Sequence, residues 1–321
     1  MHQFNEHHPE LKGVSAFYHT EIFPLLAARD GSRREAVRKT QLYGGAIAAL
    51  AVIIIVVLAI MNVHFFIPIL MGAGAGIAGV YHWQTRKIKA LTKDNIVGGI
   101  CRYIGWRFSA EVSDIPQLTL WSHLGLLPGG FVTGDKNAGS RASFEDEMQG
   151  EAHGAQFRSL EVHLERRGKN SYNTVMRGQM MTITFPRKFL GKTVVLRDKG
   201  FLQRKTRGDM KRVGLVDPVF ERIFEAYSTD QVEARYLLTP DFMQKLVDLE
   251  RSVNGSQIRF GFMQGQLLIV VETPNRYEAG SMFEPLTKPE PTQKILDEIG
   301  AVYDVIDAVL KPKPYPSNAN T

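Results

Sequence analysis

The chain has only one cysteine, Cys101, among its 321 residues. No disulfide can therefore form within the chain, which excludes a disulfide-stabilised secreted scaffold and suits a reducing compartment. Cys101 lies in an apolar segment next to two glycines, so we expect it to be a packing residue. About forty largely polar residues precede the first apolar run, and for that reason we expect no cleaved signal peptide.

Charge is absent from two adjacent stretches, residues 42–61 and 65–83, which contain no Asp, Glu, Lys or Arg. Twenty helical residues rise about 30 Å, which is the thickness of the hydrocarbon core of a bilayer. The sequence therefore predicts a two-span transmembrane helical hairpin, 42–61 and 65–83. The segment 1–41 before it should be polar and disordered at first, with a short helix that Pro24 and Gly31 interrupt.

Basic residues at both outer ends of the predicted hairpin give it an orientation. Arg38 and Lys39 precede the first span, Arg86 and Lys87 follow the second, and the connecting loop contains no Lys or Arg. The positive-inside rule then places both termini in the cytoplasm. We expect a multi-pass protein of the inner (cell) membrane whose residues 84–310 form a cytoplasmic domain.

Small residues recur at a spacing of four within the two spans, which lets transmembrane helices approach closely. The predicted packing residues are Gly45, Ala49, Gly72, Gly76 and Gly79. Gly74, Gly76 and Gly79 also form a G-x-G-x-x-G pattern. A dinucleotide-binding loop must follow a strand of a soluble βαβ unit, whereas this pattern lies inside an apolar span, so we expect no nucleotide cofactor.

Residues 84–310 combine strand patterns with helix patterns. Strands are expected near residues 147–153, 157–166, 178–185 and 193–197, with a hairpin at 258–262 and 267–272, and helices are expected at 216–227, from 239 onward and at 291–310. Consecutive strands joined by short turns predict an α+β domain with a mainly antiparallel sheet. The Pro-rich tail, residues 311–321, should be disordered.

An acidic cluster in this domain is the candidate for chemistry. Glu145, Asp146 and Glu147 precede His153, and carboxylates at this density could hold a divalent cation or provide an acid and a base. We take Glu145, Asp146 and His153 as metal candidates. No spacing matches a known metal loop, and a solvated loop that enters a strand is the alternative. The sequence predicts no catalytic residue, because no nucleophile-elbow spacing is present.

Positive charge is concentrated in one part of the domain. Residues 155–212 contain 15 Lys and Arg against 4 Asp and Glu, whereas residues 213–310 contain 8 against 16. The densest basic run consists of Arg204, Lys205, Arg207, Lys211 and Arg212. It could contact anionic lipid or a protein partner, or it could be a solvated loop without a partner. Nucleic acid is not expected, because the run lacks interleaved aromatic residues and any known binding motif.

The run DPVFERIFEAYSTDQVEARYLLTPDFMQKLVDLE, residues 217–250, followed by IRFGFMQGQLLIVVE, residues 258–272, resembles the bacterial DUF3137 family of uncharacterised membrane proteins. The order of features agrees as well: an N-terminal helix, two adjacent spans, a Glu145-Asp146 step and a G-K-T turn at 191–193. The resemblance implies a two-span bacterial membrane protein with a cytoplasmic α+β domain. It brings no catalytic residues, and it implies structural roles for its recurrent positions, with Asp217 and Thr239 as caps, Leu237 and Leu238 as core and Gly265 as turn.

These observations favour a non-enzymatic, membrane-anchored module whose cytoplasmic domain binds a protein partner or an anionic lipid surface. One alternative is a metal-dependent enzyme that acts at the inner membrane face through the acidic cluster. Another is a small subunit of a transport complex, which would require oligomerisation because the spans contain no charge for an ion path. The identity of the partner and a homo-oligomeric state stay open.

Overall fold

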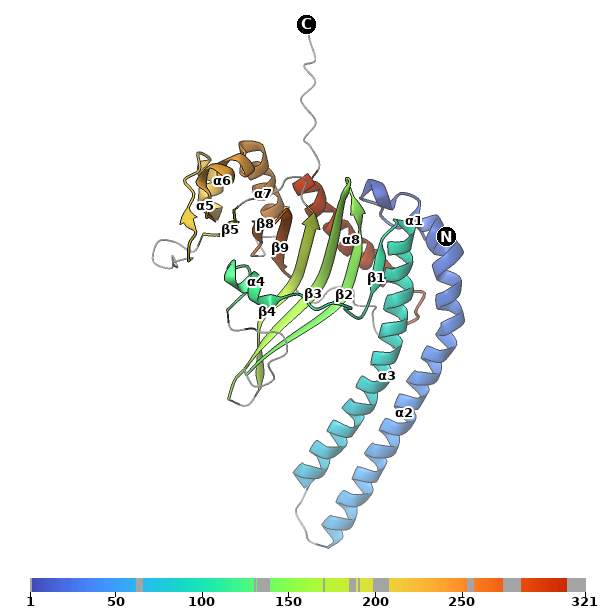
Figure 1. Ribbon diagram of the computed structural model, residues 1–321. Coiled ribbons are helices and arrows are strands. Elements are labelled where there is room, and N and C mark those ends of the chain that lie inside the picture. Colours follow the sequence, from blue (N-terminus) through green and yellow to red (C-terminus); the bar gives the residue numbers. More distant parts are fainter. Residues whose placement is uncertain are drawn as a thin grey trace. The chain divides into compact units, whose positions relative to one another are not determined.

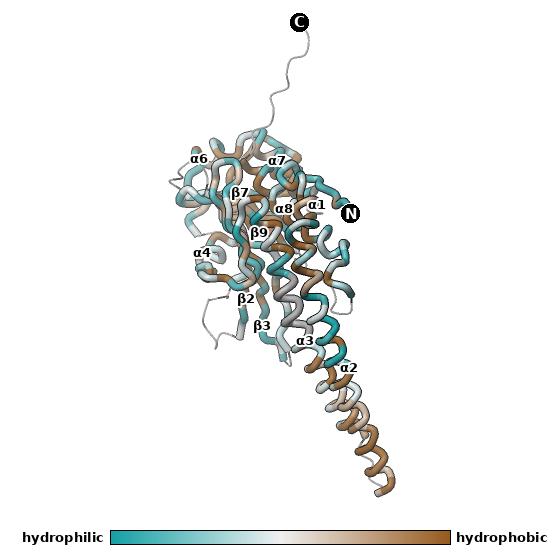
Figure 2. Tube along the Cα trace, turned by 90° about the vertical axis from the view of Figure 1, so that its right-hand side faces the viewer, coloured by the Kyte–Doolittle hydropathy of each residue, from teal (hydrophilic) through white to brown (hydrophobic). Residues whose placement is uncertain are grey.

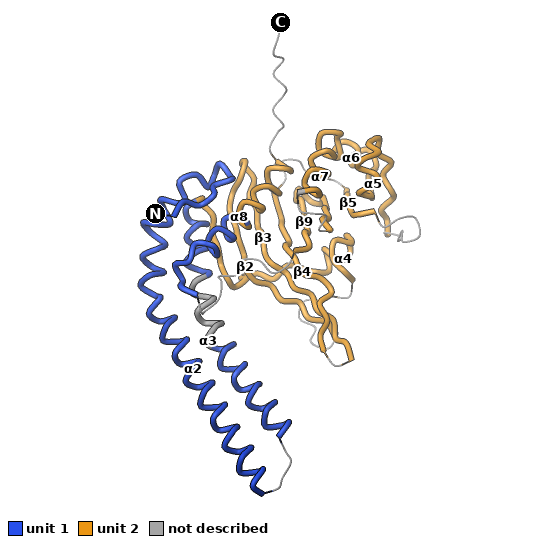
Figure 3. Tube along the Cα trace, turned by 180° about the vertical axis from the view of Figure 1, so that it is seen from behind, with its two compact units in different colours: residues 1–103, 277–297 blue, residues 104–276, 298–321 orange. Residues whose placement is uncertain are grey.

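The structure is a computed structural model that describes residues 2–61, 66–129, 131, 139–169, 171–184, 189, 191–198, 208–252, 257–273 and 284–310, with the backbone alone at 84–92 and 252. The chain divides into two compact units (Figure 3). Unit 1 comprises residues 1–103 and 277–297, and unit 2 comprises residues 104–276 and 298–321. The predicted tail, 311–321, and the loop between the predicted spans lie outside the described residues.

Two long helices dominate unit 1: α2, Phe23–Ile60, and α3, Phe66–Tyr103, which lie side by side (Figure 1). Each has 38 residues and is therefore about 57 Å long. The predicted spans occupy about half of this length, and the hydropathy colours of Figure 2 show the apolar end of the hairpin. The predicted interruption at Gly31 is wrong, because a single glycine costs a helix only about 1 kcal/mol and packing against α3 offsets that cost.

The two helices meet along a narrow seam. Half-buried or buried side chains recur at intervals of three and four residues, at Gly44, Ile47, Ala51, Ile55 and Leu58 of α2 and at Phe66, Ile69, Ala73, Gly76, Ile77 and Val80 of α3. Such a spacing turns only one stripe of each helix toward its neighbour. The remaining apolar side chains are exposed, and only 6% and 0% of the most apolar windows of the two helices are buried. Both helices are long and apolar enough to cross a membrane.

The N-terminal residues of unit 1 form a helical cap, which consists of a 3-10 helix η1, Pro9–Leu11, a turn of α-helix α1, Val14–Phe17, and a π-helix η2, Tyr18–Ile22. The expected disorder of the first residues is therefore wrong. Phe4 and Leu11 are buried, and the carboxylate of Glu6 accepts hydrogen bonds from the N–H groups of Gly13 at 2.8 Å and Ser15 at 2.9 Å. Burial and these bonds offset the entropy that is lost when the segment becomes ordered.

Nine described strands form the antiparallel sheet of unit 2, in the order β1-β2-β3-β4-β9-β8-β5-β7-β6. Their bounds are β1 Arg107–Ser109, β2 Ser140–Ala152, β3 Ala155–Arg167, β4 Tyr172–Thr184, β5 Thr193–Arg197, β6 Lys211–Arg212, β7 Phe224–Ser228, β8 Arg259–Met263 and β9 Gln266–Glu272. The predicted α+β class with a mainly antiparallel sheet is thus confirmed. Helices contribute to the same unit as α4 Leu118–His123, α5 Pro218–Ile223, α6 Gln231–Leu237, α7 Pro240–Ser252 and most of α8, Pro289–Leu310.

Both faces of the sheet are covered by apolar side chains. On one face, Leu160, Val162 and Met180 pack in a cluster with Leu118 and Trp121 from α4. The second face carries an aromatic cluster in which the Trp106 ring stacks on Tyr303 of α8, at 4.2 Å between centroids, and meets Phe157 of β3 edge-on at 4.6 Å. Strands that are buried on both faces lose the alternation by which a sequence reveals them.

This loss of alternation explains one error in the helix predictions. The helix expected at 216–227 ends at Ile223, and residues 224–228 form β7, which pairs with β5 and is buried along its whole length. The helix start is correct, because the side chain of Asp217 accepts hydrogen bonds from the N–H groups of Val219 at 2.8 Å and Phe220 at 3.0 Å. Apolar residues at helical spacing continue into residues 224–228. All five are buried, so the strand shows no alternation that would distinguish it from a helix.

Glycine is required at two points of the sheet. A Cβ at Gly178 of β4 would lie 2.1 Å from the carbonyl oxygen of Val271 in β9, so no larger residue fits there. The turn between β8 and β9 has positive φ at Gln264, 53°, and at Gly265, 73°, which is the conformation of a two-residue hairpin turn. The turn role that the resemblance implies for Gly265 agrees with this geometry.

Candidate functional site

The acidic cluster lies in the interior of β2 rather than in a solvated loop. The pairing of β2 with β3 shifts its register between Glu145 and Met148, and Asp146 has a positive φ of 59°. A bulge of this kind re-aims side chains and breaks the strand alternation. Asp146 and Glu147 are only 1% and 3% exposed. The loop alternative for these two residues is therefore wrong.

Glu147 has hydrogen-bond partners that keep it ionised. Its carboxylate accepts hydrogen bonds from Nε of Arg158 at 2.5 Å and from the backbone N–H of Ser113 at 3.1 Å. Burial by itself raises the pKa of Glu147, but hydrogen bonds from Gln149, Ser113 and Arg158 outweigh burial and lower the pKa below its ordinary value. An acid held in this way is a poor proton donor at neutral pH.

Glu145 shares its partner with a buried neighbour on the next strand. Nε of Arg177 on β4 donates to Glu161 of β3 at 2.9 Å, and Nη2 of the same guanidinium donates to Glu145 at 3.4 Å. Glu161 is only 2% exposed, so it needs a countercharge to remain ionised. The polar contacts run across three neighbouring strands and hold charges that the sheet would otherwise exclude.

His153 is kept away from the bulge by its position and its partner. It occupies the turn between β2 and β3, about 20 Å further along the strand, and its Nε2 lies 2.5 Å from the carboxylate of Asp307 in α8. Among the residues that the structure describes, no three His, Cys, Asp or Glu side chains are grouped to hold a metal ion. The structure does not bring Glu145, Asp146 and His153 together.

Two of the five residues in the basic run are described. Lys211 and Arg212 form β6, which pairs with Tyr227 and Ser228 of β7 at the end of the sheet, and both side chains are exposed. The other three, Arg204, Lys205 and Arg207, lie outside the described residues. The described pair can reach a partner in solution without any rearrangement of the sheet.

The predicted packing residues of the hairpin mostly face away from its seam. A Cβ at Gly76 would lie 3.6 Å from Ile47 of α2, which is ordinary contact. At Gly45, Gly72 and Gly79 an added Cβ would meet nothing within 4 Å, and Ala49 is exposed as well. Of the five, the seam between α2 and α3 includes Gly76 alone.

Cys101 lies near the end of α3 and is fully buried. Burial raises the pKa of its thiol to about 12. A thiol with this pKa is protonated at neutral pH and is therefore a poor nucleophile and a poor metal ligand. Its environment agrees with the packing role that the sequence predicts.

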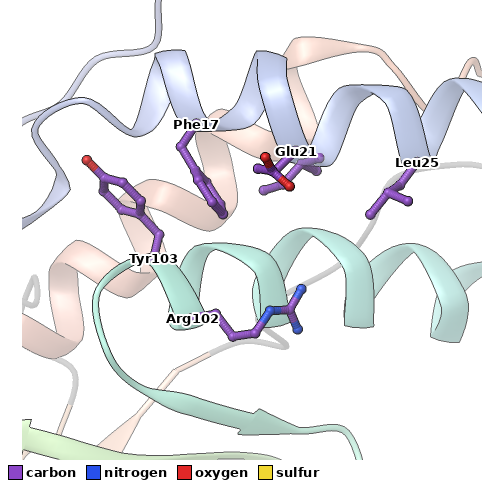
Figure 4. A pocket seen from close by; sticks show the side chains of 6 residues that line it. Phe17, Glu21, Leu25, Arg102 and Tyr103 are labelled. Carbon is purple, nitrogen blue, oxygen red and sulfur yellow. The ribbon is translucent and has the colours of Figure 1, made fainter.

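A pocket of about 240 Å³ lies in unit 1, between the π-helix and first turn of α2 on one side and the last turn of α3 on the other (Figure 4). Phe17, Glu21, Ile22, Leu25, Arg102 and Tyr103 line it. The Phe17 and Tyr103 rings lie 4.8 Å apart at 36° and form one wall. A π-helix at such a position is common at functional sites in proteins.

The pocket has a carboxylate and a guanidinium that are not paired with each other. Neither Glu21 nor Arg102 forms an ion pair or a side-chain hydrogen bond within the described parts of the chain. Sequence reasoning missed this site. The helical spacing of Phe17, Ile22 and Leu25 marks one wall, but nothing in a single sequence brings residues 102 and 103 next to it.

Comparisons with known proteins give one family and one distant structure. A family model described as "Protein of unknown function (DUF3137)" matches residues 174–311. No curated protein matches the chain. A crystal structure of the mycobacterial trehalose monomycolate transport factor A, TtfA, aligns with 70% of this chain and 98% of its own, at 12% identity and a TM-score of 0.31. Residues 174–311 thus match the DUF3137 family model, in agreement with the resemblance of the C-terminal third.

Proposed function

We propose that this chain is a membrane-anchored binding protein. The helices α2 and α3 cross the inner membrane as a hairpin, both termini lie in the cytoplasm, and the remainder of the chain binds a protein partner there. The observation that carries the proposal is the exposure of apolar side chains along both helices. In the most apolar window of each helix, only 6% of the residues of α2 and 0% of those of α3 are buried.

Lipid is the environment that suits this exposure best. Leaving a Val, Leu or Ile side chain in water instead of burying it costs roughly 1.5–3 kcal/mol, and the two helices expose many of them, including Leu50, Val52, Ile53, Ile60, Ile67 and Leu70. A core helix of a water-soluble protein would bury these side chains inside its own chain. The apolar parts of the two helices, residues 42–60 and 66–83, have the length of the bilayer core, about 30 Å.

A binding role is favoured over catalysis by the contacts of two buried carboxylates, one in the bulge of β2 and one on the neighbouring strand β3. Glu147 and Glu161 are both held by arginines from neighbouring strands. Carboxylates engaged in this way act as counterions within the sheet, which favours a structural role for them over a catalytic one. No described feature favours the metal-dependent alternative.

Anionic lipid is the second candidate partner, and the exposed pair Lys211 and Arg212 supports it. Each basic residue near an anionic surface contributes about 1 kcal/mol, so the described pair alone would provide only transient contact. A protein partner has better support, because unit 1 offers a formed pocket.

The proposal is tested by extraction of native membranes with alkaline carbonate, which removes peripheral proteins. We expect the full chain to stay with the membrane pellet and to leave it only with detergent. Recovery of the chain in the carbonate wash would show that the hairpin does not span the bilayer.

A further inference from the structure

The size of the pocket in unit 1 restricts what can enter it. Cavities that bind drug-sized ligands measure about 300–1,000 Å³, whereas a cavity of about 150 Å³ lined by aliphatic and aromatic side chains holds a benzene ring. At about 240 Å³, this pocket has room for a single aromatic or large aliphatic side chain. It is too small for a nucleotide or another large cofactor.

The walls of the pocket are held in place before anything binds. The Tyr103 hydroxyl donates a hydrogen bond to the carbonyl oxygen of Lys12 at 2.6 Å, which fixes the ring. Ile22 is 2% exposed and packs so closely on α3 that a Cβ at Gly99 would lie 2.8 Å from its side chain. A recess that needs no rearrangement loses little entropy when it is filled.

The two charges at the pocket favour particular residues on either side of the entering side chain in the partner segment. Glu21 comes from the π-helix and Arg102 from α3, so the two charges approach the pocket from opposite walls (Figure 4). Leu25 is 46% and Tyr103 36% exposed, which leaves the pocket open toward solvent. A segment that places a base near Glu21 and an acid near Arg102 would bind in a single orientation.

We infer that this pocket receives one aromatic or large aliphatic side chain from a segment of a partner protein, with a basic residue on one side of that anchor and an acidic residue on the other. The inference rests on the proposed function, because it locates the partner contact of the membrane-anchored protein. Most of the affinity in such contacts comes from one buried anchor, while the charges at its rim orient the partner.

The test uses the full chain in nanodiscs. A library of random peptides displayed on phage is first depleted on empty nanodiscs and then selected for binding to nanodiscs that contain the chain. Enriched peptides should share an aromatic or large aliphatic residue between a base and an acid. The variant Leu25→Asp places a charge in the pocket and should weaken the binding of these peptides by at least about 30-fold, which is the size of a hot-spot loss. The control Ala27→Asp adds the same charge elsewhere on the exposed surface of α2 and should change binding by less than about twofold.

Charge reversal gives a second, independent readout. Arg102→Glu should weaken the enriched peptides by about fivefold, the size of a rim ion pair, and exchange of their acid for lysine should restore binding. Equal effects of Leu25→Asp and Ala27→Asp, or no enrichment at all, would overturn the inference. So would a dimer of the parent chain that Leu25→Asp converts to a monomer, because a second copy would then fill the pocket. Failure of the chain to assemble into nanodiscs would instead contradict the proposed function.

Discussion

The two units of this protein depart from the usual distribution of side chains in opposite ways. In unit 1, α2 and α3 expose valine, leucine and isoleucine over half their length. In unit 2, the sheet buries Asp146, Glu147 and Glu161 to within 1–3% of full burial. A water-soluble protein would normally keep apolar residues inside and carboxylates outside.

Each departure needs its own compensation, and the compensations differ in kind. Apolar surface on the hairpin requires an apolar environment outside the chain, which we propose to be lipid. Buried carboxylates in the sheet require countercharges inside the chain, which Arg158 provides for Glu147 and Arg177 provides for Glu161. The stability of the hairpin therefore depends on the apolar environment around it, while the stability of the sheet depends on ion pairs within the chain.

The largest expected effect is the difference in stability between a glycine-to-alanine substitution in the sheet and one in the hairpin. Gly178→Ala would place a Cβ against the backbone of β9 and should destabilise unit 2 by at least about 4 kcal/mol, measured by thermal unfolding. Gly72→Ala in α3 meets nothing within 4 Å and should leave stability unchanged or improve it by up to about 1 kcal/mol. A mild Gly178→Ala would mean that β4 and β9 are not in the register described.

An arginine introduced at an exposed valine tests whether that valine faces lipid, as we expect in unit 1, or water, as we expect in unit 2. Val52 of α2 is 60% exposed and Val232 of α6 is 77% exposed. Val52→Arg should cost about 3 kcal/mol of membrane insertion, whereas Val232→Arg should stay within about 0.5 kcal/mol. The recovered membrane fraction of each variant measures the difference. Equal recovery would place the middle of α2 in water.

Removal of a countercharge tests the internal compensation of the sheet. Arg158→Met should cost about 2–3 kcal/mol, because it leaves Glu147 buried without its arginine countercharge, while Arg158 itself is a quarter exposed. Arg235→Met, at an exposed position of α6, is the control and should change stability by less than about 0.5 kcal/mol. The double variant Arg158→Met/Glu147→Met should recover most of the loss, and failure to recover would show that the pair is not an isolated interaction.

The smallest expected effect is the pH dependence of that same carboxylate. Its pKa in the folded protein lies below the ordinary value of 4.5, so Glu147 stabilises unit 2 above about pH 4.5, and this contribution disappears as the pH falls through the lowered pKa. In Glu147→Gln the melting temperature should fall less steeply with acid than in the parent. Calorimetry from neutral to acidic pH would show this, and parallel curves would contradict it.

Much of the fold followed from patterns that a sequence reveals directly. Uncharged runs marked the apolar halves of α2 and α3, alternation marked β3, and the pairing of Asp217 with Pro218 marked the start of α5. Residues 224–228 escaped because burial on both faces removed the alternation. The order of the N-terminal cap was not predicted, because it depends in part on contacts with residues far along the chain, such as the hydrogen bond from the Asn5 N–H to the side chain of Gln293 at 2.7 Å.

The candidate sites were harder to predict than the fold. In a strand that alternates strictly, Asp146 would face opposite to Glu145 and Glu147, but the register shift and the positive φ of Asp146 interrupt the alternation at this point. The small residues at spacing four suggested a packing face, yet the seam follows Gly44, Ile47 and Ala51 instead. The pocket of unit 1 joins residues 17–25 to residues 102 and 103, a contact that no local pattern contains.

The most direct test of the central claim is the labelling of introduced cysteines from one side of the membrane at a time. Met61→Cys marks the end of α2 and Arg235→Cys marks unit 2, while the buried Cys101, with its thiol pKa of about 12, stays silent. With a membrane-impermeant thiol reagent we expect label on Met61→Cys in intact spheroplasts, and label on Arg235→Cys only after the membrane is opened. Labelling of both positions from the same side would contradict a membrane-spanning hairpin.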